Sequence, residues 1–122
     1  MNRLALIIGS SFCALSVALG AFGTHAIADL VTPARVDTWQ TAARYLMTQG
    51  LGLLLVGLLS RTLKFSFKLQ TWLLMAGTII FCLSLFSLVV FDLPILGAVA
   101  PIGGILMIAG WGALAIAIAK RT

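Results

Sequence analysis

The chain contains one histidine, His25, and the first of its three acidic residues, Asp29, follows four positions later. In a helix this spacing places both side chains on one face. An imidazole beside a carboxylate can act as a general base, but a nucleophile must also lie within its reach, and no His, Cys, Asp or Glu residues have metal-ligand spacing. One histidine also cannot supply paired axial haem ligands. We therefore expect no enzyme activity, metal or cofactor.

More polar and aromatic residues follow His25, and several are also spaced by one helical turn. Arg35 lies four positions before Trp39, which permits a cation–π contact, and Tyr45 lies four before Gln49. One interpretation is a polar pocket where the outer face of the membrane meets water. The other, which we favour, is that these groups satisfy one another and the backbone where the chain turns. The candidate outer-face cluster comprises His25, Asp29, Trp39, Tyr45 and Gln49.

Composition identifies the environment of these residues as a membrane. Of 122 residues, 61% are hydrophobic and 9% are charged, which is far from the balance of a soluble globular domain. Uncharged runs of roughly 20 residues match the hydrocarbon thickness of a bilayer when they are helical. The sequence predicts a single all-α domain over residues 1–122, a polytopic four-transmembrane-helix bundle. Its expected spans are residues 4–23, 42–60, 71–90 and 101–119.

Local signals predict where these helices begin and end. Thr32 followed by Pro33 is typical of a helix N-terminus, so the second helix should begin outside the hydrocarbon. Asp92 and Pro94 should end the third helix, and Pro101 suits the first turn of the fourth.

The basic residues predict the orientation in the membrane. Six lie at the N-terminus, between the second and third spans or in the tail, and only Arg35 and Arg44 lie on the other side with all three aspartates. Both termini should therefore face the cytoplasm of a bacterial inner membrane. The net charge of +5 favours contact with anionic lipid headgroups and requires no nucleic acid. A cleaved signal peptide is a competing interpretation, but the first run is long for one and lacks a convincing cleavage site.

Small residues recur at intervals of seven, which predicts left-handed, close helix packing. We expect an up-down bundle with a glycine-lined, solid interior rather than an aqueous channel. A row with Ala14 and Ala18 could also support a homo-oligomer. The recurring residues are Gly9, Ser16 and Gly23; Ala43, Gly50 and Gly57; Gly77 and Ser84; and Gly103, Gly110 and Ala117.

Two classes of function remain. Transporters generally carry a charge inside the membrane, whereas this chain has no glutamate and no charge at the midplane of its spans. The first class, which we favour, is a structural or accessory protein that binds membrane lipids or a membrane-protein partner. The second is a small carrier or lipid-handling protein that uses the outer polar pocket.

An ordered set of motifs resembles one family over essentially the whole chain. The set is "GAFGTHA", a tryptophan fourteen residues after the histidine, "TAARY", "PIGG" and "GW". It is similar to the domain of unknown function 423 family, which implies a bacterial inner-membrane protein with four spans and assigns no activity. That family commonly has alanine where Thr24 stands and histidine where Gln49 stands, so a two-histidine site is not available here. The motif residues expected to pack are Gly20, Phe22, Gly23, Pro101, Gly103, Gly104, Gly110 and Trp111.

The glycines of these motifs carry a specific packing prediction. Gly20 and Gly23 close the first span, and Gly103 and Gly104 open the last. We predict that the two helix ends touch at the outer face, since glycine permits close backbone approach. Gly104→Leu should then lower thermal stability.

Overall fold

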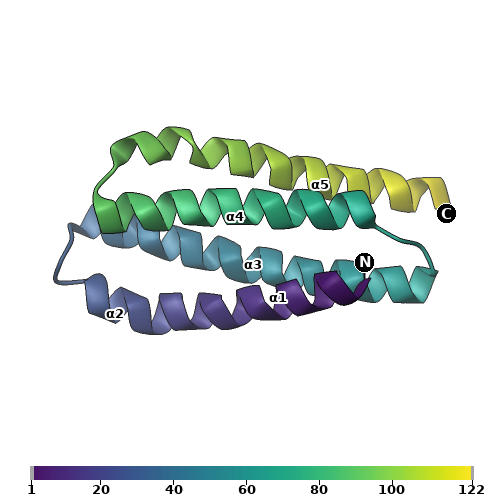
Figure 1. Ribbon diagram of the computed structural model, residues 1–122, viewed down its shortest axis with the longest axis horizontal. Helices are drawn as coiled ribbons and strands as arrows, with labels where there is room; N and C mark the ends of the chain where they lie inside the picture. Colours follow the sequence, from purple (N-terminus) through teal and green to yellow (C-terminus); the bar gives the residue numbers. More distant parts are fainter. Residues whose placement is uncertain (1, 122) are drawn as a thin grey trace.

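A computed structural model describes residues 2–121, and it consists of helices joined by short connections (Figure 1). Four continuous stretches are long and apolar enough to cross a membrane, which confirms the predicted four-span, all-α fold. They consist of α1 (Asn2–Val17), the π-helix η1 (Ala18–Gly23) and α2 (Thr24–Ile27); α3 (Pro33–Leu63); α4 (Lys68–Phe91); and the 3-10 helix η2 (Pro94–Ala98) with α5 (Ala100–Arg121).

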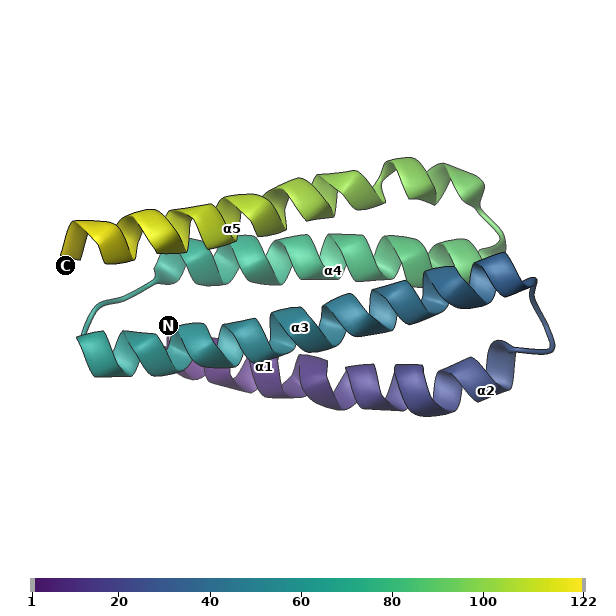
Figure 2. The same cartoon turned by 180° about the vertical axis from the view of Figure 1, so that it is seen from behind.

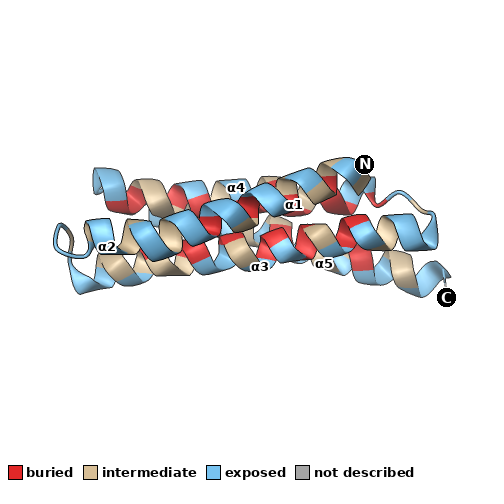
Figure 3. Ribbon diagram, turned by 90° about the horizontal axis from the view of Figure 1, so that it is seen from below, coloured by how far each residue is buried: buried red, intermediate tan, exposed pale blue. Residues whose placement is uncertain are grey.

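The helices pack in the order α1, α3, α4, α5, and each one runs antiparallel to the next (Figures 1 and 2). Within residues 2–121, α1 and α5 make no extensive contact with each other. Helices α3 and α4 therefore lie at the centre, whereas α1 and α5 have mostly exposed outer faces (Figure 3).

The two ends of the bundle differ in charge. Both termini and the loop of residues 64–67 lie at one end, which we call the basic end (Figure 1). The opposite end, with residues 28–32 and 92–99, is called the acidic end because it holds all three aspartates.

The predicted signals at the start of α3 and at the end of α4 coincide with the ends of these helices. Thr32 caps α3, and its Oγ1 accepts a hydrogen bond from the backbone N–H of Arg35 at 3.3 Å, with Pro33 as the first helical residue. Helix α4 ends at Asp92, which has a left-handed backbone with φ of 52°. Lys64 ends α3 in the same conformation, with φ of 54°.

Glycines allow close contact within each of two helix pairs. A Cβ atom on Gly9 of α1 would lie 2.6 Å from the carbonyl oxygen of Gly50 in α3. Equivalently, a Cβ on Gly77 of α4 would lie 2.7 Å from the carbonyl oxygen of Gly103 in α5. Such distances are too short for any side chain, so glycine at these positions brings the two backbones into direct contact.

The centre of the bundle differs from the predicted glycine-lined interior. Large apolar side chains fill it, among them the fully buried Leu53 and Leu74. The repeat of seven correctly identifies faces where small residues pack, but these faces form the α1–α3 and α4–α5 contacts instead of one shared interior.

Several buried polar side chains within the spans donate to backbone carbonyls. Ser16 Oγ donates to Ala43 O at 2.6 Å, which joins α1 to α3. Thr78 Oγ1 donates to Leu74 O within its own helix at 2.6 Å. These bonds remove the cost of placing a hydroxyl in a water-free interior.

Candidate functional site

The structure does not bring His25 and Asp29 into a site. His25 lies exposed on α2, and Asp29 lies exposed in the turn that follows it. Among the described residues, the only ion pair joins Arg35 and Asp92, so His25 and Asp29 do not pair with each other. The predicted five-residue outer-face cluster therefore does not form as a unit.

Trp39 is a buried anchor between α3 and the first span. Its indole Nε1 donates to the carbonyl oxygen of Leu19 in the π-helix at 2.7 Å. Gly23 lies against the ring, where a Cβ atom would come within 2.8 Å of Cζ2. The edge of the ring also meets Phe86 of α4, with centroids 4.6 Å apart. Trp39 therefore holds the first span against α3 near the acidic end.

Arg35 does not lie over Trp39, and the suggested cation–π contact is not formed. Its guanidinium instead reaches the end of α4. There Nη1 donates to Leu88 O at 2.9 Å, and Nη2 lies 2.9 Å from Asp92 Oδ1. Arg35 thus adds a cationic donor to a carbonyl at the C-terminus of α4, where cations are favoured.

Tyr45 and Gln49 lie together at a cavity in the side of the bundle, which we call the lateral cavity. Its volume is about 380 Å³, within the range of ligand pockets. Ile108 is 73% exposed, and Tyr45 is 42% exposed. The cavity therefore opens at the side of the bundle, within the length of the spans. The lining residues are Tyr45, Gln49, Phe81, Gly104, Met107, Ile108 and Trp111.

A hydrogen bond organises the polar part of the lateral cavity. Trp111 Nε1 donates to Gln49 Oε1 at 2.9 Å. The indole ring fits against α3 because residue 52 is glycine; any Cβ there would overlap ring atoms Cζ2 and Cη2. Tyr45 packs on Phe81 with ring centroids 4.7 Å apart. The pocket therefore presents aromatic and aliphatic surface beside a paired amide, which suits an apolar ligand such as an acyl chain.

The cavity offers little for acid–base chemistry. His25 does not line it, and Tyr45 supplies the only titratable side chain among its lining residues. Across residues 2–121, no group of three His, Cys, Asp or Glu side chains could hold a metal ion. The arrangement is suited to binding.

The predicted contact between Gly20 or Gly23 and Gly103 or Gly104 is wrong. Gly20 faces Ala43 and Gly23 faces Trp39, both in α3, whereas Gly103 faces α4. The error arises because spacing shows which residues share a helix face but not which helix covers that face. A Cβ on Gly104 would meet no atom within 4 Å, so the stated reason for Gly104→Leu to destabilise the protein is also wrong.

The remaining motif residues have different environments. Gly110 packs against Leu74, and Phe22 and Pro101 are exposed. Gly104 and Trp111 instead line the lateral cavity with Tyr45 and Gln49. These four residues come from two helices far apart in the chain, so no spacing in the sequence joins them.

Comparison with known proteins supports the resemblance found in the motifs. The family described as "Protein of unknown function (DUF423)" matches residues 19–104. A "UPF0382 membrane protein" of Staphylococcus epidermidis is 39% identical over 118 residues, which cover 97% of each chain. UPF0382 membrane proteins from Staphylococcus haemolyticus and Staphylococcus aureus are 38% and 37% identical over equal shares of each chain. No solved structure matches. With this coverage and identity, the chain belongs to the DUF423 family of multi-pass membrane proteins.

Proposed function

We propose that this protein is an accessory protein of a bacterial inner membrane that binds lipid, with an acyl chain held in the lateral cavity. It has no catalytic role in this proposal. The observation that carries it is the cavity itself, which opens through Tyr45 and Ile108 on a surface that hydrocarbon covers in a membrane.

The chemistry of the cavity supports this ligand. The amide oxygen of Gln49 is already paired with Trp111, so an incoming chain meets mainly apolar surface. Gly104 leaves open space because it has no side chain and no neighbour there. A flexible hydrocarbon chain could fill this space without any polar partner.

The charge distribution supports cytoplasmic termini. The basic end carries six Lys and Arg residues, whereas the half of the bundle nearer the acidic end carries only Arg35 and Arg44 with all three aspartates. Cysteines placed singly at Ser66 and Ala28, in a protein with Cys13→Ala and Cys82→Ala, would test the assignment. A membrane-impermeant maleimide applied to intact cells should label position 28 and leave position 66 unlabelled; the reverse pattern would contradict the orientation.

A cavity-filling variant tests lipid binding. Leucine at position 104 should occupy the lateral cavity, whereas leucine at position 112 is a matched control because Gly112 also has no atom within 4 Å and lies outside the lining. Trp111 can serve as the reporter in a protein with Trp39→Phe and Trp72→Phe. In vesicles of phosphatidylcholine with brominated acyl chains, Gly104→Leu should reduce quenching of Trp111, and Gly112→Leu should not. Equal quenching in both variants would refute an acyl chain in the cavity.

A further inference from the structure

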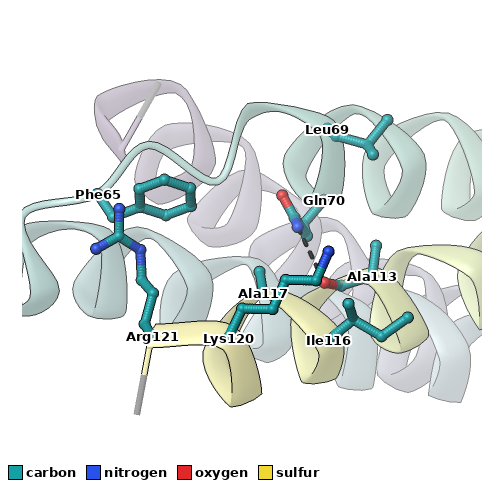
Figure 4. A pocket seen from close by; sticks show the side chains of 8 residues that line it. All are labelled: Phe65, Leu69, Gln70, Ala113, Ile116, Ala117, Lys120 and Arg121. Carbon is teal, nitrogen blue, oxygen red and sulfur yellow. Dashed lines mark hydrogen bonds between the residues drawn. The ribbon is translucent and has the colours of Figure 1, made fainter.

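A second hollow lies at the basic end, and we call it the basic groove (Figure 4). It runs between the start of α4, the loop of residues 64–67 and the last two turns of α5, and its volume is about 630 Å³. It lies apart from the lateral cavity and shares no lining residue with it. The lining residues are Phe65, Leu69, Gln70, Ala113, Ile116, Ala117, Lys120 and Arg121.

The floor of the basic groove is apolar. Leu69 and Ile116 are exposed on its two sides, and the small side chains of Ala113 and Ala117 leave room between them. The one amide there, Gln70, is already used, because its Nε2 donates to Ala113 O at 3.1 Å. This part of the groove can therefore accept hydrocarbon but offers few free polar partners.

The rim of the groove carries two cations. The guanidinium of Arg121 lies 3.6 Å from the centre of the Phe65 ring, which holds it over the loop. Figure 4 shows Arg121 extending toward Phe65 and Lys120 extending toward Gln70, so the two cations approach the groove from different sides. When a guanidinium lies over an aromatic ring, its N–H groups remain free to bind a phosphate in the plane of the guanidinium.

Within residues 2–121, no carboxylate neutralises the positive charge of this rim. All three aspartates of the chain lie at the acidic end, and no carboxylate pairs with Lys120 or Arg121 among residues 2–121. Lys68 at the first position of α4 adds to the positive potential beside the groove. A ligand that complements both the apolar floor and the cationic rim must carry an anionic group attached to apolar chains.

We propose that the basic groove is a binding site for an anionic glycerophospholipid from the adjacent leaflet. Lys120 and Arg121 bind its phosphate, and the floor around Leu69, Ala113 and Ile116 packs against the upper part of an acyl chain. Basic residues at the end of a span also attract anionic lipid without a specific site, so the test must separate the groove from general surface charge.

Two double variants of the full-length protein make this separation. Lys120→Gln with Arg121→Gln removes two charges from the groove. Arg3→Gln with Arg61→Gln removes two charges from the same end outside its lining. Binding of phosphatidylglycerol and of phosphatidylcholine is measured by native mass spectrometry of detergent-purified protein. The groove variant should weaken phosphatidylglycerol binding about tenfold, and the control about twofold, with phosphatidylcholine unaffected.

The proposal is wrong if the two double variants lose affinity equally, because that result would indicate surface charge alone. It is also wrong if inorganic phosphate binds as tightly as the lipid, since the apolar floor would then contribute nothing. Phe65→Leu should cause a smaller loss than the double variant while leaving every charge in place, and Arg121→Lys should bind better than Arg121→Gln. Gly104→Leu should leave the preference for phosphatidylglycerol intact, so failure of the acyl-chain proposal can be distinguished from failure of this one.

Discussion

Trp111 and Gln49 form a direct hydrogen bond between α5 and α3, with 2.9 Å from the indole Nε1 to the amide Oε1. The bond crosses between helices that belong to different glycine-packed pairs. It therefore supports the lateral cavity and also connects the two halves of the bundle.

The contribution of this bond to stability should be measurable as a coupling energy between Trp111 and Gln49. Trp111→Phe keeps most of the aromatic surface but removes the donor, and Gln49→Leu removes the acceptor. The double variant should be more stable than the sum of the single changes predicts, by about 0.6 kcal/mol, the usual size of such bonds in membranes. Unfolding in mixed micelles by titration with a denaturing detergent measures this; strictly additive losses would show that the bond adds no stability.

Two neighbouring glycines should respond in opposite ways to alanine. A Cβ on Gly103 would lie 2.5 Å from the backbone nitrogen of Phe81, so Gly103→Ala must separate α4 from α5. We expect a loss of about 1–3 kcal/mol. Gly104→Ala meets no atom within 4 Å and should leave stability unchanged or raise it by up to about 1 kcal/mol, because alanine favours the helix. Thermal unfolding in detergent compares them, and equal losses would contradict the packing of α5.

Replacing Lys64 with glycine should stabilise the protein. Its φ of 54° is a left-handed conformation that is strained for a residue with a Cβ atom. Lys64→Gly should raise the free energy of unfolding by about 0.5–1 kcal/mol. Lys64→Ala is the matched control, since it removes the same charge and keeps the strain. A gain in the alanine variant equal to that in the glycine variant would attribute the effect to charge.

The ion pair at the acidic end should matter less than the neighbouring hydrogen bond. The side chain of Asp92 is 85% exposed, whereas that of Arg35 is 25% exposed. Asp92→Asn should therefore cost at most about 0.5 kcal/mol, since exposed ion pairs contribute little and asparagine tolerates the left-handed backbone. Arg35→Ala should cost about 1–2 kcal/mol, because it also removes a charge-assisted hydrogen bond to the Leu88 carbonyl, although this carbonyl keeps the backbone N–H donors of Asp92 and Leu93. Chemical or thermal unfolding in detergent gives both values, and a larger loss for Asp92→Asn would reverse this ranking.

Local signals in the sequence predict the ends of the elements well. Thr32 and Pro33 begin α3, and Asp92 ends α4, because capping depends on residues close together in the chain. The apolar runs likewise predict four spans, since length and composition alone decide whether a helix can cross a bilayer.

Partners between helices are less accessible from the sequence. Position 23 requires a small residue because another helix packs closely against it. The residue that contacts Gly23 is Trp39, rather than Gly103 or Gly104. The π-helix from Ala18 to Gly23 also changes the angle between successive side chains in the first span. The sequence of residues 18–23 does not predict this π-helix. His25 and Gln49 are consequently assigned to one cluster by the sequence but lie in different environments in the structure.

The placement of the glycine contacts has a consequence for biosynthesis. Gly9 meets Gly50 within the first two spans to be synthesised, and Gly77 meets Gly103 within the last two. Neither contact needs a residue from the other half. Each helical hairpin can therefore assemble as it leaves the translocon, and joining the halves through the large side chains around Leu53 and Leu74 can follow as a later event.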